Sequence, residues 1–340
     1  MADYKNIKGF NIQYLDSDPP NPIEGQMWFN STTQTLKGAE AGGVPAGTWS
    51  AGGSLPAAIY ENAGAGTNTA ALSFGGQGNP PSPLHPYTNQ NLSYNGTTWS
   101  TAASLNSARR LLSGNGTQTS ALAYGGYTVP PSANSQALTE SWDGTSWTEV
   151  NDLNTARRSS SGNGLSNTDA LMVNGTAGPS PVAQVAVEKW NGTSWTEVAE
   201  TNTTRKTSVH WGTSTDAIAA GGATATADTA FVEIYNGTSW TETTDFSAAR
   251  ALSGRSGPDS TNGIVFGGSL PGGVTANTEY WNGTSWTELN NLATARYMQG
   301  SAGQASNNAL AIGGSDTITR SDSVEEWNVP DYVVKTFTTS

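Results

Sequence analysis

Short apolar runs alternate with glycine-rich and polar turns along almost the whole chain. Residues 157–199 show the pattern once: a small-residue run ends at Gly164, an apolar run covers 170–173, an alternating run covers 185–190, and a last run starts at Trp195. Runs of about four to six residues with such boundaries predict β-strands, and no stretch keeps the apolar period of a helix. The pattern therefore predicts an all-β chain of four-stranded units, in which Asn191-Gly192 forms a two-residue type I′ turn.

The four-stranded unit recurs, and a tryptophan after a Gly-Thr turn marks each copy. These residues are Trp49, Trp99, Trp147, Trp195, Trp240 and Trp286. Each unit also carries a glycine pair or its Asn-Gly variant, at 75–76, 125–126, 174–175, 221–222, 267–268 and 313–314. Successive tryptophans lie 45 to 50 residues apart, and such a period is typical of a β-propeller. We expect six blades, with the recurring aromatic residues packed between them.

An incomplete unit at the C-terminal end predicts how the ring closes. Residues 296–327 hold three predicted strands, and the missing tryptophan strand occurs instead at 47–50. We expect this N-terminal strand to complete the last blade; the alternative is the alternating stretch 332–338. The chain then divides into an N-terminal docking arm with a hairpin (1–46), a propeller (47–330) and a C-terminal tail (331–340).

The order of signals within each unit resembles the Kelch repeat. A basic residue precedes a small-residue strand, then come an apolar strand ending in a glycine pair, a Glu-x-aromatic strand and a tryptophan strand. The resemblance covers about residues 48–330. It implies a six-bladed Kelch-like propeller, and it implies no activity, because one fold supports many functions.

Basic and acidic residues recur together. Eight of the fifteen basic residues stand at one repeat position: Arg109, Arg110, Arg157, Arg158, Arg205, Lys206, Arg250 and Arg296. A glutamate stands two residues before the third-strand aromatic in the same five units: Glu140, Glu188, Glu233, Glu279 and Glu325. The first complete unit lacks both, with Ala57-Ala58 and Leu92 in these places. Joint presence and joint absence favour structural ion pairs within blades over a cationic, anion-binding rim, because a lone buried charge is costly.

Composition argues mainly by exclusion. The formal net charge of −12 disfavours binding to nucleic acid or to an anionic membrane. No apolar run is long enough to span a membrane, and the N-terminus has no secretory signal, so we expect synthesis as a soluble cytoplasmic chain. The chain has no cysteine, and its two histidines, His85 and His210, are isolated. We therefore expect no metal, no cofactor, no catalytic residue and no enzyme.

Binding residues are predicted in the loops between the second and third strands, which differ most from unit to unit. Variable loops on a rigid scaffold are the usual place for recognition. The first of these loops is the longest and carries His85 and Tyr87, and Tyr127 begins the second. These three residues are the candidates for ligand contact. The alternative is that the loops merely tolerate insertions.

The N-terminal arm carries the second resemblance. Ser17-Asp18-Pro19-Pro20-Asn21-Pro22 is followed by a predicted hairpin, Gly25 to Lys37. These two segments, together with the C-terminal sequence from Glu325-Glu326-Trp327-Asn328 to Ser340, resemble the corresponding sequences in structural proteins of marine tailed phages of the cyanophage and pelagiphage type. There the same arm precedes Kelch-like arrays. The resemblance implies docking onto other virion proteins, for which the arm offers Phe10, Tyr14 and Trp28.

Together these features predict a virion structural protein. Its propeller would be displayed on a tail fibre or appendage, as a homo-oligomer in the particle, and would attach to a glycan or outer-membrane component of the host surface. One alternative is a capsid decoration or joining subunit without ligand binding. Another is a soluble lectin-like propeller.

Overall fold

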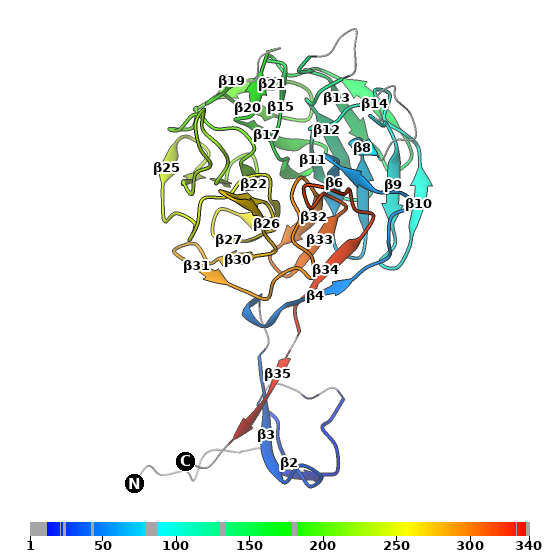
Figure 1. The fold of residues 1–340 in the computed structure, drawn as a ribbon, viewed down its shortest axis with the longest axis vertical. Helices are drawn as coiled ribbons and strands as arrows, with labels where there is room; N and C mark the ends of the chain where they lie inside the picture. Colours follow the sequence, from blue (N-terminus) through cyan, green and yellow to red (C-terminus); the bar gives the residue numbers. More distant parts are fainter. Residues whose placement is uncertain are drawn as a thin grey trace. The chain divides into compact units, whose positions relative to one another are not determined.

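Two compact units make up the chain. The computed structural model describes residues 12–20, 22, 25–41, 44–78, 87–128, 134–178, 182–330 and 332–337. One unit combines both chain ends, Met1–Gly47 and Val329–Ser340, and the other is the repeat region Thr48–Asn328. Apart from a single 3-10 turn, η2 (Val44–Ala46), the regular elements of the described residues are β-strands (Figure 1). The chain is therefore all-β, as predicted.

Six four-stranded antiparallel sheets form the described part of the repeat region. In chain order their strands are β6 (Ala63–Gly66), β7 (Ala71–Phe74), β9 (Asn91–Tyr94), β10 (Trp99–Ala102); β11 (Ser113–Gly116), β12 (Ala121–Tyr124), β13 (Thr139–Trp142), β14 (Trp147–Val150); β16 (Asn163–Ser166), β17 (Asp169–Val173), β20 (Val187–Trp190), β21 (Trp195–Val198); β22 (Val209–Gly212), β23 (Ala217–Ala220), β24 (Val232–Tyr235), β25 (Trp240–Glu242); β26 (Gly254–Asp259), β27 (Asn262–Phe266), β30 (Thr278–Trp281), β31 (Trp286–Glu288); and β32 (Gly300–Ala305), β33 (Asn308–Ile312), β34 (Val324–Asn328), β4 (Thr48–Ala51). Shorter strands cross-link the loops: β5 (Ile59–Tyr60) with β8 (Gln77–Gly78), β15 (Arg157–Arg158) with β18 (Thr176–Ala177) and β19 (Val182–Ala183), and β28 (Ser269–Leu270) with β29 (Gly273–Val274).

The first strands of the six sheets gather around a common centre (Figure 1). Each contacts the next in the order β6, β11, β16, β22, β26 and β32, and β32 contacts β6. Glycine permits this approach: a Cβ atom on Gly162 would lie 1.8 Å from the carbonyl oxygen of Gly114 on the neighbouring sheet. The arrangement is propeller-like, with small residues at the centre and aromatic residues further out.

The last sheet takes its fourth strand from the other end of the repeat region. Strand β4 pairs antiparallel with β34, and Trp49 lies opposite Trp327 with ring centroids 5.3 Å apart. The alternating stretch 332–338 was the alternative partner for β34. Its described part is β35 (Tyr332–Phe337), which pairs with β3 (Thr35–Ala41).

Strand β35 makes the C-terminal segment part of the terminal unit, whereas the sequence set 331–340 apart as a tail. The sheet order is β1 (Gln13–Leu15), β2 (Met27–Asn30), β3 and β35, with β2 and β3 forming the predicted hairpin. Asp18 organises this unit, since its carboxylate accepts hydrogen bonds from Trp28 Nε1, Asn30 Nδ2 and Lys37 Nζ at 3.0, 2.8 and 2.7 Å. Both chain ends are thus needed to complete one small sheet.

The Asn-Gly turns differ from the prediction. Trp190 pairs with Trp195, so the loop has four residues, and only Gly192 takes a positive φ, of 92°. The Asn191 side chain accepts hydrogen bonds from the backbone N–H groups of Thr193 and Ser194, both at 2.9 Å. Asparagine is therefore used as a side-chain acceptor rather than for a left-handed backbone. The same need explains Asp143 at this position in the second unit, because a carboxylate accepts equally well.

Aromatic residues pack within and between the sheets. Trp195 lies 5.4 Å from Trp190 of its own sheet and 5.0 Å from Tyr124 of the preceding sheet, measured between ring centroids. Its indole N–H donates to the hydroxyl of Thr139 at 3.0 Å. Large rings with a satisfied polar atom supply much of the core between adjacent sheets.

Candidate functional site

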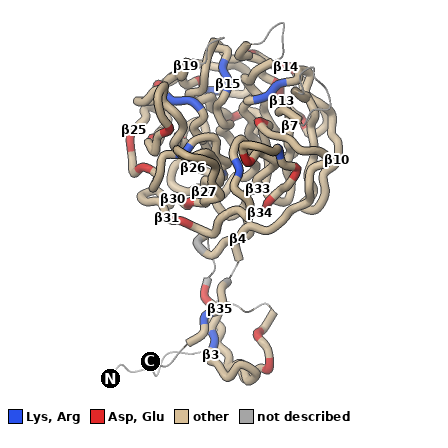
Figure 2. The backbone as a smooth tube through the Cα atoms, in the orientation of Figure 1, with Lys and Arg blue, Asp and Glu red and all other residues tan. Residues whose placement is uncertain are grey.

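The recurring arginines and glutamates form ion pairs within their own sheets. Each pair joins a guanidinium nitrogen to a carboxylate oxygen, and both side chains are buried. The two atoms are 2.6 to 2.8 Å apart in the pairs of Arg109, Arg157, Arg205 and Arg296. The pairs are Arg109–Glu140, Arg157–Glu188, Arg205–Glu233, Arg250–Glu279 and Arg296–Glu325. Figure 2 shows basic positions distributed among the sheets. These ten side chains are enclosed and face no ligand surface.

The third unit shows what each pair connects. Nη1 of Arg157 donates to the carbonyl oxygens of Asn174 and Ala186 at 3.1 and 2.6 Å, and Nη2 donates to Glu188 at 2.7 Å. The other carboxylate oxygen of Glu188 accepts from the backbone N–H of Asn154 at 2.7 Å. Burial lowers the pKa of Arg157, and the negative charge of Glu188 opposes this shift. The pair therefore connects the segment that precedes the first strand, at Asn154 and Arg157, to the end of the second strand and the start of the third.

The first unit replaces this network with apolar residues. Gly314 N–H donates to Ile59 O, as Gly126 N–H donates to Arg157 O, so Ile59 holds the arginine position. The prediction of Ala57-Ala58 for the arginine doublet was therefore wrong by two residues, whereas Leu92 holds the glutamate position opposite Ser73. Ile59 and Leu92 belong to one buried cluster. Pro56, which has no N–H, stands three residues before Ile59, where the third unit has Asn154.

The second basic residue of each doublet has a different environment. Arg110 and Arg158 reach the strand-two to strand-three loops, where Tyr127 lies between them. The guanidinium carbon of Arg110 is 5.5 Å from the ring centroid of Tyr127, and that of Arg158 is 4.5 Å from it. The first members of these two doublets are thus paired with a glutamate of their own sheet, whereas Arg110, half-buried, and Arg158, buried, contact the loops.

Tyr87 extends this row of alternating aromatic and cationic side chains. Its ring centroid lies 6.3 Å from that of Tyr127 and 4.8 Å from the guanidinium carbon of Arg110. Arg110 also forms an ion pair with Glu61 at 2.7 Å. Arg158 donates to the hydroxyl of Ser135 at 2.8 Å, and no carboxylate of the described residues pairs with it. Burial lowers the pKa of Arg158, as expected for a cation without an acidic partner.

The structure brings two of the three predicted binding residues together. Tyr87 and Tyr127 are half-buried neighbours, and His85 lies outside the described residues. The sequence grouped Arg110 and Arg158 with the buried arginines, although a signal separated them. The first member of the doublet is arginine in five units, whereas the second varies among Arg110, Arg158, Lys206, Ala251 and Tyr297. The second position is buried at Arg158 and Ala251 and half-buried at Arg110, Lys206 and Tyr297, so it holds varied side chains beside the loops.

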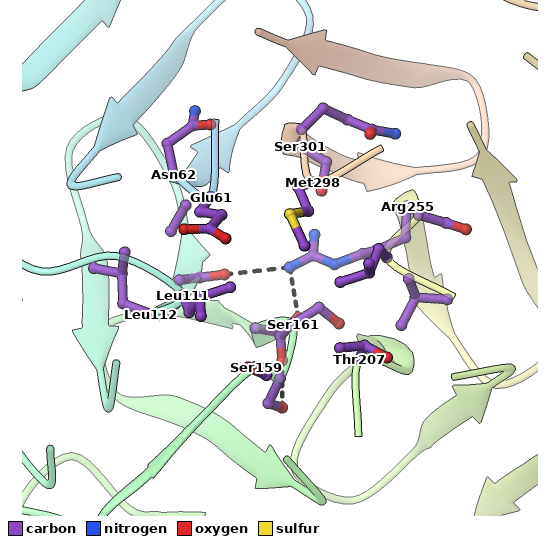
Figure 3. Close-up of a pocket in the computed structure, with 18 of the residues that line it drawn as sticks. Glu61, Asn62, Leu111, Leu112, Ser159, Ser161, Thr207, Arg255, Met298 and Ser301 are labelled. Carbon is purple, nitrogen blue, oxygen red and sulfur yellow. Dashed lines mark hydrogen bonds between the residues drawn. The ribbon is translucent and has the colours of Figure 1, made fainter. Parts of the chain in front are cut away.

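A cavity of about 90 Å³ opens at the centre of the repeat region (Figure 3). One residue of each unit borders it with a left-handed backbone, φ between 53° and 60°. These residues are Glu61, Leu111, Ser159, Thr207, Leu252 and Met298. Each backbone N–H donates to the carbonyl of the equivalent residue in the preceding unit, and Glu61 N–H donates to Met298 O at 2.8 Å. The six hydrogen bonds form a cycle, which offsets a conformational cost of roughly 1–2 kcal/mol per residue.

The arm residues divide between core and surface. Trp28 is buried, which corrects the expectation that its ring docks onto another chain, because its indole is held against Asp18. Tyr14 is 78% exposed. Phe10 lies outside the described residues.

Neither known protein-family models nor curated proteins match this sequence. In the part of the chain that the structure describes, no cluster of three or more His, Cys, Asp or Glu could hold a metal ion. Nor is any helix in that part long and apolar enough to cross a membrane.

Proposed function

We propose that the protein is a virion structural protein of a tailed phage, displaying a closed, six-bladed Kelch-like propeller for attachment to the host surface. The observation that carries this proposal is the terminal unit, in which strands from both ends of the chain share one sheet. A repeat region inserted into such a unit is connected to it at both ends. This is a suitable architecture for holding a binding domain on a particle.

Two features support six blades and closure. The fourth strand of the last sheet comes from residues 48–51, so the first and last units are joined by strand pairing. The cycle of backbone hydrogen bonds around the central cavity includes one residue from each of six units. A Kelch-like propeller accounts for both.

Exposed apolar side chains support a docking role for the terminal unit. They are Ile12, Tyr14, Val334 and Phe337, which are 39% to 78% exposed. Exposed apolar residues in a small unit favour burial against a partner. Other virion proteins are the partners that the phage resemblance implies.

The test of docking changes this surface and leaves the core of the unit intact. Phage particles would be assembled with Tyr14→Asp/Phe337→Asp protein, with Ile318→Asp as the control, since Ile318 is 90% exposed and belongs to the repeat region. We expect the double variant to be absent from purified particles and the control to be present. Normal incorporation of the double variant would contradict docking through this surface.

Attachment is proposed for the loop face, where Tyr87, Arg110, Tyr127 and Arg158 alternate. Aromatic rings and arginines together suit sugars that carry acidic groups, as found on bacterial surfaces. We expect Tyr127→Ala particles to adsorb more slowly to host cells than wild-type particles. Unchanged adsorption with normal incorporation would instead favour a decoration or joining subunit without a ligand.

A further inference from the structure

The innermost strands show one exceptional residue. One register position of the innermost strands holds Gly64, Gly114, His210, Arg255 and Ser301. Their partners on the second strands are, in the same order, Ser73, Ala123, Ala219, Val265 and Ala311. Gly162 holds this position in the third unit, directly before Asn163. Three of six units thus have glycine here, and only the fifth has a residue that is charged at neutral pH. The sequence offered this comparison, although the repeat signals did not draw attention to it.

Arg255 spans the centre of the repeat region (Figure 3). Its Nη2 donates to the carbonyl oxygens of Gly114 and Gly162, at 3.2 and 2.5 Å, on two other sheets. The glycines leave the space that its side chain fills. Its Nε is buried without a hydrogen-bond partner, and Nη1 makes no hydrogen bond within the described residues.

The charge of Arg255 is not neutralised by the described part of the chain. No Asp or Glu of that part forms an ion pair with it, and burial lowers its pKa to about 10, so it stays cationic at neutral pH. His210, the other titratable residue in the register, has its pKa lowered to about 3 by burial and is neutral. A buried charge without a partner strongly opposes folding, because its lost hydration is not replaced.

The cavity beside Arg255 has a mixed polar and apolar lining and is open enough for a small ligand. Ser159 and Ser301 line it, and their hydroxyl groups make no hydrogen bond within the described residues. Glu61 also lines it, but its carboxylate is paired with Arg110. The volume of about 90 Å³ exceeds the roughly 10–15 Å³ that one water needs.

We propose that this central cavity binds a small monovalent anion, such as chloride or a simple carboxylate, that pairs with Arg255 and accepts hydrogen bonds from the serine hydroxyls. The anion neutralises the charge of Arg255 and stabilises the contact of the fifth sheet with the second and third. The inference rests on the cavity and is independent of the proposed function in a virion.

Thermal unfolding of the full chain at neutral pH and constant ionic strength tests the proposal. Sodium chloride and sodium acetate serve as probes. Arg255→Gln is compared with Lys189→Gln, which changes the net charge equally and removes a lysine of β20 that forms no ion pair within the described residues. Because a ligand that binds only the folded state stabilises it by RT ln(1 + [L]/Kd), we expect the melting temperature of wild type and of Lys189→Gln to rise with anion concentration, in proportion to its logarithm above Kd, and that of Arg255→Gln to stay constant. An equal rise in Arg255→Gln, or no rise in wild type, would overturn the proposal.

A direct measurement covers the case in which Arg255→Gln does not fold. Crystals of the wild-type chain soaked in sodium bromide should show an anomalous peak within hydrogen-bond distance of the Arg255 guanidinium. Ser301→Ala, which removes a hydroxyl and keeps the charge, should weaken this peak. A map in which bromide avoids the cavity of the wild-type protein would contradict the assignment.

Discussion

Breaking a single Arg–Glu pair should destabilise the protein strongly, whereas converting the whole network to that of the first unit should not. Glu188→Leu leaves the buried guanidinium of Arg157 and the N–H of Asn154 without their acceptor. Removing one partner of a buried ion pair costs about 3–5 kcal/mol. Arg157→Ile leaves a buried carboxylate and should cost a similar amount.

The chain itself supplies the compensated variant. Asn154→Pro/Arg157→Ile/Glu188→Leu reproduces Pro56, Ile59 and Leu92 of the first unit, and Leu153 already matches Leu55. Both charges and the N–H donor are then removed together. We expect the triple variant to lie within about 2 kcal/mol of wild type, because replacing a buried ion pair by apolar residues is often near neutral.

The assay is equilibrium unfolding in urea, followed by tryptophan fluorescence. Glu197→Leu is the matched control: Glu197 lies opposite Glu188 in the same sheet but is exposed, so its loss should change stability by about 0.5 kcal/mol or less. A triple variant as unstable as Glu188→Leu, or a Glu188→Leu protein as stable as the control, would refute the reasoning.

Three further predictions concern other parts of the molecule. Burial lowers the pKa of His210 from 6.5 to about 3, so as the pH falls the unfolded chain takes up a proton on this residue before the folded chain does. The free energy of unfolding should therefore fall by about 2 kcal/mol between about pH 7 and pH 5. Urea titrations of His210→Gln at these two pH values should lack this loss. Asn191→Ala removes the acceptor of two backbone N–H groups and should lower the free energy of unfolding by about 1 kcal/mol, while Asn191→Asp, which copies Asp143, should be neutral in the same assay. Hydrogen bonds from Lys37, Asn30 and Trp28 lower the pKa of Asp18 from 3.8 to about 2. The stability that this carboxylate gives the terminal unit should therefore be complete above about pH 4 and be lost as the pH falls through about 2. Asp18→Asn should show faster amide exchange in that unit already at neutral pH.

The repeat pattern carried most of the fold. Strand types, the glycine pairs and the pairing of Trp49 beside Trp327 all follow from local rules that recur in every unit, so errors in one copy are corrected by the others. The turn type was predicted wrongly, because Asn-Gly suits both a two-residue type I′ turn and a four-residue loop in which the asparagine side chain accepts backbone hydrogen bonds. The pairing of Trp190 with Trp195 shows that the loop has four residues. The small-residue run was predicted to end at Gly164, whereas the strand in it, β16, covers Asn163–Ser166; Arg157–Arg158 forms the separate strand β15, which pairs with Thr176–Ala177.

The candidate sites were harder to predict, because they depend on departures from the repeat. The role of Arg255 depends on glycines of two other units, 93 and 141 residues away in sequence. The partnership of β35 with β3 joins the two ends of the chain, and no local pattern indicates it. Comparing units position by position would have identified Arg255, whereas the pairing of the chain ends required the structure.

Quantitative mass spectrometry of purified phage particles is the most direct test of the central claim that this chain is a displayed virion protein. Its peptides would be counted against those of the major capsid protein. We expect the chain in intact particles, in far fewer copies than the capsid protein, as befits a tail fibre or appendage. Its absence from particles that contain every other structural protein would contradict the account.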